Sequence, residues 1–286
     1  MIPTPRIVRQ RGFTLAELAI VFLIVALLIG GTVMTLAAQT EAREITDTQR
    51  TLDQAREAII GFALRNGRLP CPATNGSIDV SGAATTPSNG RESFCSNIAP
   101  GACGANVFVA PAHGRCSNPN NGFVPAAALG IGPIETNPAS ASFGLALDSW
   151  LQPIRYSVTQ VFSPTPPPNT VMLFTAPGEM RSNILAAPPI APDLVVCTTS
   201  AGAVPATPAC GPAVPSFQTP AIVYSTGKNA VAAGVGVDEV ENGNADRIFV
   251  ARPPTPFNPP AAGFDDLVIW VSPNILYNRL IAAGAI

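Results

Sequence analysis

An uninterrupted apolar run near the N-terminus dominates the hydropathy pattern of this chain. Residues 18–40 form 23 positions without a charged side chain, and Glu17 stands immediately before them. A helix needs roughly 20 apolar residues to cross the ~30 Å hydrocarbon core of a bilayer. The run therefore predicts a transmembrane helix, taken as residues 13–40. By the positive-inside rule its N-terminal end lies in the cytoplasm, because three arginines precede the run: Arg6, Arg9 and Arg11.

Beyond the apolar run the helical pattern continues but becomes one-sided. Charged residues now alternate with apolar residues at helical spacing, and the apolar set is Ile45, Leu52, Ala55, Ile59, Ile60, Ala63 and Leu64. The pattern ends near Asn66-Gly67, before Pro70. An apolar stripe of this kind is typical of a helix that packs on a domain through one face. We predict an amphipathic continuation of the helix over residues 41–67.

The second half of the chain contains short apolar segments separated by Pro/Gly-rich turns. They are residues 154–162, 171–176, 193–199, 221–226, 247–251 and 266–272. Such segments are typical of strands, and their short spacing predicts one antiparallel sheet. A last helix is predicted from Pro273 to Ala283, with Ser272 as N-cap and Gly284 as terminator. The fold class is α+β: a long N-terminal helix, membrane half plus amphipathic half, packed on an antiparallel β-sheet head.

Six cysteines all follow the apolar run: Cys71, Cys95, Cys103, Cys116, Cys197 and Cys210. The predicted topology places them outside the cytoplasm, where an even number of cysteines favours disulfides. We predict a bond between Cys197 and Cys210, and pairing of the other four among themselves in one of three ways. A zinc site that includes His113 is the alternative. It is disfavoured because no CxxC occurs and the spacings do not match structural zinc ligands.

Composition and charge exclude several classes of function. With 31 Pro, 24 Gly and 12% charged residues, the chain is rich in loops, and residues 71–145 read as loops joined by disulfides. A formal net charge of −2 gives no basic footprint for nucleic acid. His113 is the only histidine, so no catalytic set emerges and we expect no enzyme. Asp265 and Asp266 are adjacent on a predicted strand, where they would point to opposite faces rather than share a proton.

A short motif precedes the apolar run and carries the most specific information in the chain. It reads Arg11-Gly12-Phe13-Thr14-Leu15-Ala16-Glu17-Leu18 and resembles the processing site of type IV prepilins and type II secretion pseudopilins. The alternatives are an ordinary secretory signal peptide and a plain membrane anchor. A signal peptide has a shorter apolar core and its cleavage site after that core. A plain anchor gives no reason for a costly carboxylate at Glu17.

The resemblance implies how this segment is processed and assembled. A prepilin peptidase would cut between Gly12 and Phe13 and methylate the new N-terminus of Phe13. Glu17 would then neutralise the N-terminal amine of a neighbouring Phe13 inside an assembled fibre. The implied domains are a leader (1–12), a transmembrane and assembly helix (13–40), an amphipathic continuation (41–67) and a pilin-like periplasmic or extracellular head (68–286).

The resemblance also implies a place and a role. The protein would sit in the bacterial inner membrane as a single-pass protein with a periplasmic head, and then enter a type IV pilus or a type II secretion pseudopilus. Its partners would be prepilin peptidase, other pilin or pseudopilin subunits and an inner-membrane assembly platform. A mature chain of 274 residues is bulky for a fibre shaft, so a minor subunit is favoured. The alternative is a tip-located adhesin or substrate-binding module on a pilin anchor.

The head bears a weaker resemblance to the major pseudopilins. The matching segments are Asp148-Ser149-Trp150 with Pro153 and Tyr156, Tyr224-Ser225-Thr226-Gly227, an acidic loop, and Asp265-Asp266 shortly before Trp270. In those relatives an acidic loop binds calcium, a cation that prefers oxygen ligands. The residues that would supply them here are Asp238, Glu241, Asn244 and Asp246. A solvated acidic turn is the alternative, and apart from this calcium no cofactor is expected.

Overall fold

The computed structural model describes residues 14–75, 87–98, 103–164, 170–186, 188–212, 214–230, 236–255 and 263–285, without the side chains of residues 29–38. The chain divides into two compact units, Met1–Thr46 and Asp47–Ile286. The second unit holds the strands of the described residues and the last part of the long helix, from Asp47 to Asn66. Together the elements give the predicted α+β class.

Helix α1 covers Leu15–Asn66, a length of 52 residues. It ends where the sequence predicted, because Gly67 adopts a φ of +64° that side chains other than glycine rarely accept. In the second unit the predicted apolar stripe is buried, and Leu52, Ala55, Ile59 and Ala63 are each 0% exposed. The amphipathic continuation is therefore confirmed as the part of α1 that packs on the head.

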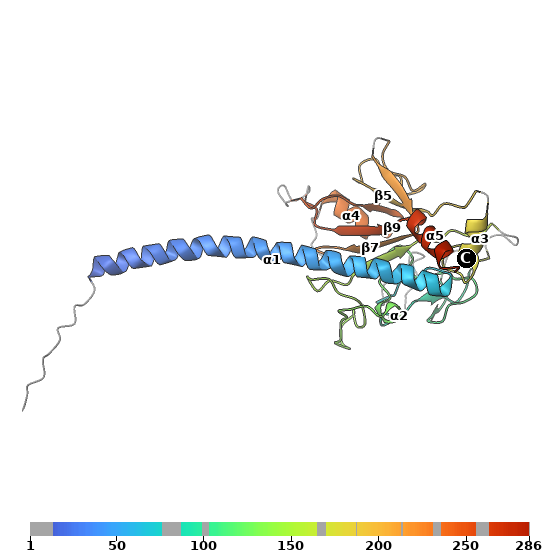
Figure 1. Ribbon diagram of the computed structural model, residues 1–286, viewed down its shortest axis with the longest axis horizontal. Helices are drawn as coiled ribbons and strands as arrows, with labels where there is room; N and C mark the ends of the chain where they lie inside the picture. The colour runs from blue at the N-terminus through green and yellow to red at the C-terminus, as the bar shows by residue number, and fades with distance from the viewer. Residues whose placement is uncertain are drawn as a thin grey trace, which may run out of the picture. The chain divides into compact units, whose positions relative to one another are not determined.

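The larger sheet is antiparallel and has four strands in the order β3-β4-β7-β9. Their bounds are β3 Gly122–Phe123, β4 Arg155–Val158, β7 Ala221–Ser225 and β9 Leu267–Val271. Three of these strands lie within predicted segments, while the two-residue β3 comes from the region read as loops. In the view of Figure 1, β7 and β9 lie between the second half of α1 and strand β5.

A second sheet corrects the prediction of a single antiparallel one. It has the order β6-β5-β8, with bounds β5 Leu194–Cys197, β6 Ser216–Thr219 and β8 Ile248–Val250. β5 pairs antiparallel with β6 but parallel with β8. Strand β6 was not predicted, because its sequence SFQT contains no run of apolar residues. In the structure only its last residue, Thr219, is buried.

The prediction of a strand over residues 171–176 was wrong. The segment forms consecutive turns, in which the Ala176 amide donates to the Met172 carbonyl. Its apolar side chains are buried all the same: Met172, Leu173 and Phe174 are at most 3% exposed. A short apolar run shows that a segment is buried but does not distinguish a strand from a compact turn.

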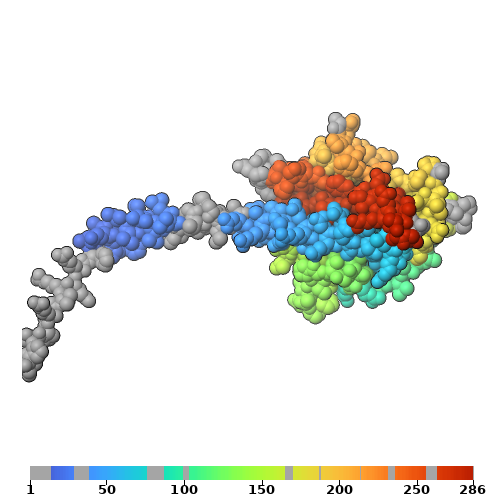
Figure 2. All heavy atoms as spheres, in the orientation of Figure 1, coloured from blue at the N-terminus to red at the C-terminus, as the bar shows by residue number. Residues whose placement is uncertain are grey.

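The remaining elements are short. They are β1 Phe94–Cys95, β2 Asn106–Val107, α2 Ala126–Leu129, α3 Glu179–Leu185, α4 Val237–Gly243 and α5 Pro273–Ala282. Helix α5 confirms the predicted last helix, with Pro273 at its start and Gly284 just beyond its end. Figure 2 shows α5 against the last turns of α1, where Arg279 pairs with Glu57 at 2.5 Å.

The two sheets share one hydrophobic core. Side chains from β5, β7 and β8 form its centre: Leu194, Val196, Ile222, Tyr224 and Phe249. Val268 and Trp270 of β9 pack against this centre and stay partly exposed. The face of β9 that carries Val268 and Trp270 therefore borders this core.

All six cysteines are paired, as predicted. Cys197 bonds to Cys210, and the other four form the pairs Cys71–Cys116 and Cys95–Cys103. Of the three pairings left open by the sequence, the structure selects this one. The bonds fasten the loop-rich region to the end of α1, since Cys71 lies five residues beyond Asn66.

An ion pair with little exposure joins the same region to α1. Arg68 donates to Glu92 at 2.6 and 2.9 Å, and the Cys71 amide donates to the same carboxylate at 2.8 Å. The guanidinium of Arg68 also lies 5.0 Å from the ring centroid of Phe62 and 5.3 Å from that of Phe94. Glu92 thus balances a buried cation and satisfies a backbone donor at the same point.

Candidate functional site

The N-terminal segment begins, in the described structure, with a helix cap. Glu17 accepts hydrogen bonds from the amide and hydroxyl of Thr14 at 2.8 and 2.9 Å, and its own amide donates to the Thr14 hydroxyl at 3.3 Å. This reciprocal arrangement is a capping box. Gly12 and Phe13 lie outside the described residues. Glu17 therefore holds the first turn of α1, next to the place where the sequence predicts the new N-terminus.

The first unit leaves its large apolar side chains exposed. Leu15 is 91% exposed, Leu27 70% and Phe22 65%. Among the described residues, no helix combines the length and apolar character that a membrane crossing requires. The predicted span 13–40 includes Phe13 and the side chains of residues 29–38, which lie outside the described part. An exposed apolar surface of this extent marks a segment that is covered by something else in its working environment.

In the head, two of the motif segments that resemble the major pseudopilins meet. Asp148 accepts hydrogen bonds from the amides of Trp150 and Gln152 at 2.9 and 2.8 Å, and from the hydroxyl of Ser225 at 2.5 Å. Asp148 is 3% exposed, and this burial raises its pKa despite the three donors. The contact joins the segment before β4 to the end of β7, which is a structural role.

Three carboxylates converge at the start of β9. The ligand oxygens of Glu239, Asp265 and Asp266 all lie within 4.8 Å of one another. Glu239 comes from α4, and its two oxygens accept from the Gly236 amide at 3.1 Å and the Asp265 amide at 2.7 Å. The expectation that Asp265 and Asp266 point apart was wrong, because strand β9 begins only at Leu267.

A glycine turn brings Asp265 into this cluster. Gly227 has a φ of +64°, and a Cβ at this position would lie 2.3 Å from the Asp265 carboxylate. The next amide, that of Lys228, donates to Asp265 at 3.1 Å. A residue with a side chain at position 227 would push the carboxylate away. The YSTG segment after β7 thus shapes the acidic cluster, which sequence reasoning missed.

The four residues predicted to bind calcium are used differently. Asp238 pairs with Arg252 at 2.8 Å and accepts from Ser200 and Thr199. Asn244 and Asp246 hydrogen-bond to each other at 3.1 Å, and Glu241 is not part of the convergent group. Their calcium binding stays a prediction. The donor set that suits a hard cation by geometry is the neighbouring Glu239, Asp265 and Asp266.

The acidic cluster has strongly shifted proton affinities. Burial raises the pKa of Asp266 to about 8, although Asn242 donates to it at 2.7 Å. Burial and the neighbouring Glu239 raise the pKa of Asp265 to about 7. A bound cation would offset the repulsion among the three carboxylates.

We expect the head to lose stability as the pH rises from about 4 to about 8. In the unfolded chain both aspartates have pKa values near 3.9 and are ionised across this window. The folded protein keeps them protonated, so a rising pH favours the unfolded state, which binds fewer protons. At pH 8 Asp266→Asn should unfold at a higher temperature than the wild type. Its free energy of unfolding should be higher by up to a few kcal/mol, because one pKa unit corresponds to about 1.4 kcal/mol. Thermal unfolding of the full chain in detergent, followed by tryptophan fluorescence, measures both.

Asp193→Asn is the matched control for that experiment, since Asp193 is paired with Arg247 at 3.1 Å and its loss should not stabilise the head. An unfolding temperature for Asp266→Asn that falls below that of the wild type at pH 8 would contradict the prediction. Adding calcium at pH 8 extends the experiment. Stabilisation of the wild type that is lost in Asp266→Asn but kept in Asp246→Ala would assign the cation to the convergent carboxylates.

The alternative zinc site is contradicted by the disulfides. Cys95, Cys103 and Cys116 are all bonded to other cysteines, so no thiolate is left for a metal. His113 accepts a hydrogen bond from the Arg115 amide at 3.0 Å, and burial lowers its pKa.

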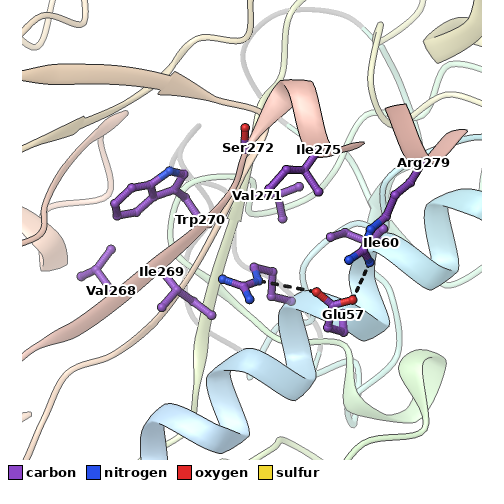
Figure 3. Close-up of a pocket in the computed structure, with 10 residues that line it drawn as sticks. Glu57, Ile60, Val268, Ile269, Trp270, Val271, Ser272, Ile275 and Arg279 are labelled. Carbon is purple, nitrogen blue, oxygen red and sulfur yellow. Dashed lines mark hydrogen bonds and ion pairs between the residues drawn. The ribbon is translucent and has the colours of Figure 1, made fainter. Parts of the chain in front are cut away.

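A groove of about 510 Å³ runs between α1, β9 and α5 (Figure 3). Five consecutive residues, Val268–Ser272, form one wall, and Ile60 and Ile275 contribute apolar side chains opposite. Three charged residues complete the lining. Arg56 and Arg279 both approach Glu57, at 3.9 and 2.5 Å.

An aromatic pair lies beside the groove. Trp270 of β9 stacks on Phe217 of β6, with ring centroids 5.4 Å apart and planes inclined by 15°. Phe217 is 47% exposed. The pair thus joins strands of the two sheets and presents aromatic surface to solvent.

Comparison with known proteins supports the N-terminal motif alone. Residues 7–33 match the prokaryotic N-terminal methylation motif. No curated protein and no solved structure matches the chain significantly.

Proposed function

We propose that this chain, which carries a prepilin-type N-terminal methylation motif, is a structural minor subunit of a type IV pilus or type II secretion pseudopilus. Prepilin peptidase would remove residues 1–12 and methylate Phe13. The mature chain, whose net charge falls from −2 to −5 on losing three arginines, would then join a fibre through the first half of α1. The role proposed is structural and not enzymatic.

The single observation that carries this proposal is that the methylation motif, matched over residues 7–33, covers the exposed apolar start of helix α1. Every residue from Thr14 to Leu28 is exposed in the isolated chain, and Glu17 is the only charge in that stretch. In a bundle of such helices the apolar surface is covered by lipid or by neighbouring subunits. We place the head in the periplasm, a compartment in which its three disulfides are stable.

The cap at Glu17 suggests how assembly uses this carboxylate. The Thr14 amide and the Thr14 hydroxyl both donate to Oε2 of Glu17, and Thr14 is the residue next to the amine that cleavage would create at Phe13. We propose that Oε1 accepts the amine of a neighbouring subunit. A carboxylate and an amine in an apolar bundle are costly alone and stabilise each other when paired.

We expect Glu17→Ala to insert in the membrane as well as the wild type and to be incorporated into fibres far less. Removing the carboxylate makes insertion easier but leaves the neighbouring amine unpaired in the bundle, at about 3–5 kcal/mol. Quantitative immunoblotting of sheared fibres and of membranes measures both.

Glu41→Ala is the matched control for Glu17→Ala, because Glu41 is an exposed carboxylate on the same helix outside the motif. Equal incorporation of Glu17→Ala, Glu41→Ala and wild type would remove Glu17 from the assembly mechanism. Loss of incorporation in both variants would show that α1 tolerates no loss of charge at either position. The effect would then not be specific to Glu17.

A second candidate function is binding at the fibre tip. The exposed Phe217–Trp270 pair and the groove beside it favour this role over a purely structural head. Exposed aromatic surface next to a groove is typical of interaction sites. This function adds to fibre assembly and does not replace it, since different parts of the chain carry the two.

A further inference from the structure

Strand β9 has one unpaired edge. It is the last strand in the order β3-β4-β7-β9, with β7 on one side and, among the described residues, no strand on the other. An open edge presents a row of backbone N–H and C=O groups that seek partners, and proteins normally cover or charge such edges. Here the edge forms the wall of the groove, since Val268–Ser272 line it without interruption.

We propose that this groove binds an extended peptide segment of a partner protein, which adds as a strand beside β9 and places a carboxylate at Arg279. The proposal rests on the second candidate function, binding at the head. It is independent of the fibre assembly proposed for the N-terminal segment. The partner is defined by chemistry: a β-forming segment with alternating apolar side chains and one acidic residue.

The lining suits the two faces of such a strand. Side chains on neighbouring strands alternate between the same two faces of a sheet. On one face of β9, Val268 and Trp270 pack on the shared core. Ile269 lies on the other face by alternation, toward the side where Ile60 and Ile275 line the groove. An added strand would therefore meet apolar surface with both sets of its side chains.

Arg279 favours an acidic segment, because its carboxylate partner Glu57 is shared with Arg56. The lining contains two arginines and one carboxylate, Glu57, which Arg56 and Arg279 share. Asp53, outside the lining, also pairs with Arg56 at 3.1 Å. Arg279 is 46% exposed and can take a second carboxylate in bidentate geometry.

The dimensions fit a short segment. At about 3.3 Å per residue, the five residues of β9 offer an edge of about 17 Å, enough for a strand of five or six residues. Specific recognition of this kind uses main-chain hydrogen bonds for affinity and alternate side-chain pockets for selectivity. The groove supplies both along the same wall.

Two other occupants are disfavoured. A second copy of this chain, paired through β9, would bring the strand Leu267–Val271, which has no carboxylate to meet Arg279. A sugar ring needs a free aromatic face, whereas one face of Trp270 is already stacked on Phe217. The second copy is a distinguishable outcome of the experiment, because it would appear as dimerisation.

The experiment measures binding of a fluorescent peptide, Thr-Val-Glu-Val-Thr-Val, to the full chain in detergent by fluorescence anisotropy. Two matched probes accompany it: the same peptide with Lys in place of Glu, and one with alternate backbone amides methylated. We expect saturable binding of the first probe, at least about tenfold weaker binding of the Lys probe, and loss of binding for the methylated probe. Hydrogen exchange of the β9 amides should slow only with the first probe.

Variants then locate the site. Arg279→Glu should weaken binding at least about tenfold, whereas Arg181→Glu, an exposed arginine on α3 outside the groove, should bind like the wild type. Equal binding of the methylated probe, or no binding of any probe, would overturn the proposal. Concentration-dependent dimerisation that Arg279→Glu enhances would assign the edge to a second copy instead. Fibre incorporation of Arg279→Glu should stay normal, so a failure here leaves the assembly role standing.

Discussion

Gly12→Leu should leave the chain with its full leader and outside any fibre. The methylation motif places this glycine directly before the predicted cleavage site, and a peptidase site that accepts glycine has no room for a branched side chain. The expected effect is a loss of processing, and therefore of fibre incorporation, to background. Mass spectrometry of the N-terminal peptide from membranes and sheared fibres measures it: methylated Phe13 in the wild type, residues 1–12 retained in the variant.

Gln10→Leu is the control for this experiment, because it adds the same side chain two residues earlier and should be processed normally. Fibres that contain a Gly12→Leu chain beginning with methylated Phe13 would contradict the role of this glycine. Wild-type fibres whose subunits still begin at Met1 would contradict the whole assembly proposal.

Glu92→Ala should destabilise the head by about 3–5 kcal/mol. Glu92 is the anion that balances Arg68, whose side chain is 8% exposed, and it also accepts the Cys71 amide. Removal leaves a buried cation and a backbone donor without their partner, and both costs fall on the folded state. Equilibrium unfolding of the full chain in urea, in detergent, measures the free energy.

Asp47→Ala serves as the comparison, since it removes an exposed pair with Arg50 on α1 and should change the stability by about 0.5 kcal/mol or less. A Glu92→Ala protein whose free energy of unfolding lies within about 0.5 kcal/mol of the wild-type value would contradict this prediction. It would show that water reaches Arg68 and that the ion pair contributes no more than a surface ion pair does.

Local patterns with a single physical cause allowed correct prediction. The stripe from Leu52 to Ala63 predicted the packed half of α1, because only one helical face can be buried. Gly67 and Gly284 predicted helix ends, because few other residues adopt their backbone conformation. The bond between Cys197 and Cys210 followed from a short intervening loop. These features depend on a few residues that are close in sequence.

Features that depend on distant segments were missed. The parallel pairing of β5 and β8 joins Val195 to Ile248, and no pattern within either strand indicates its direction. The acidic cluster depends on three separate features. Gly227 forms a turn, Glu239 accepts the Gly236 amide at the start of α4, and β9 begins only after Asp265 and Asp266. The groove beside β9 depends on where α5 returns to α1. In each case the chain fold brings together residues that the sequence keeps far apart.

The disulfide between Cys71 and Cys116 has a mechanical consequence. Its two cysteines are 45 residues apart in the sequence, and Cys71 lies five residues beyond the end of α1. If a pulling force acts between α1 and a molecule bound at β9, the shortest covalent path passes through the Cys71–Cys116 disulfide and bypasses residues 72–115. Covalent tension between helix and sheet therefore does not pass through the backbone between these two cysteines.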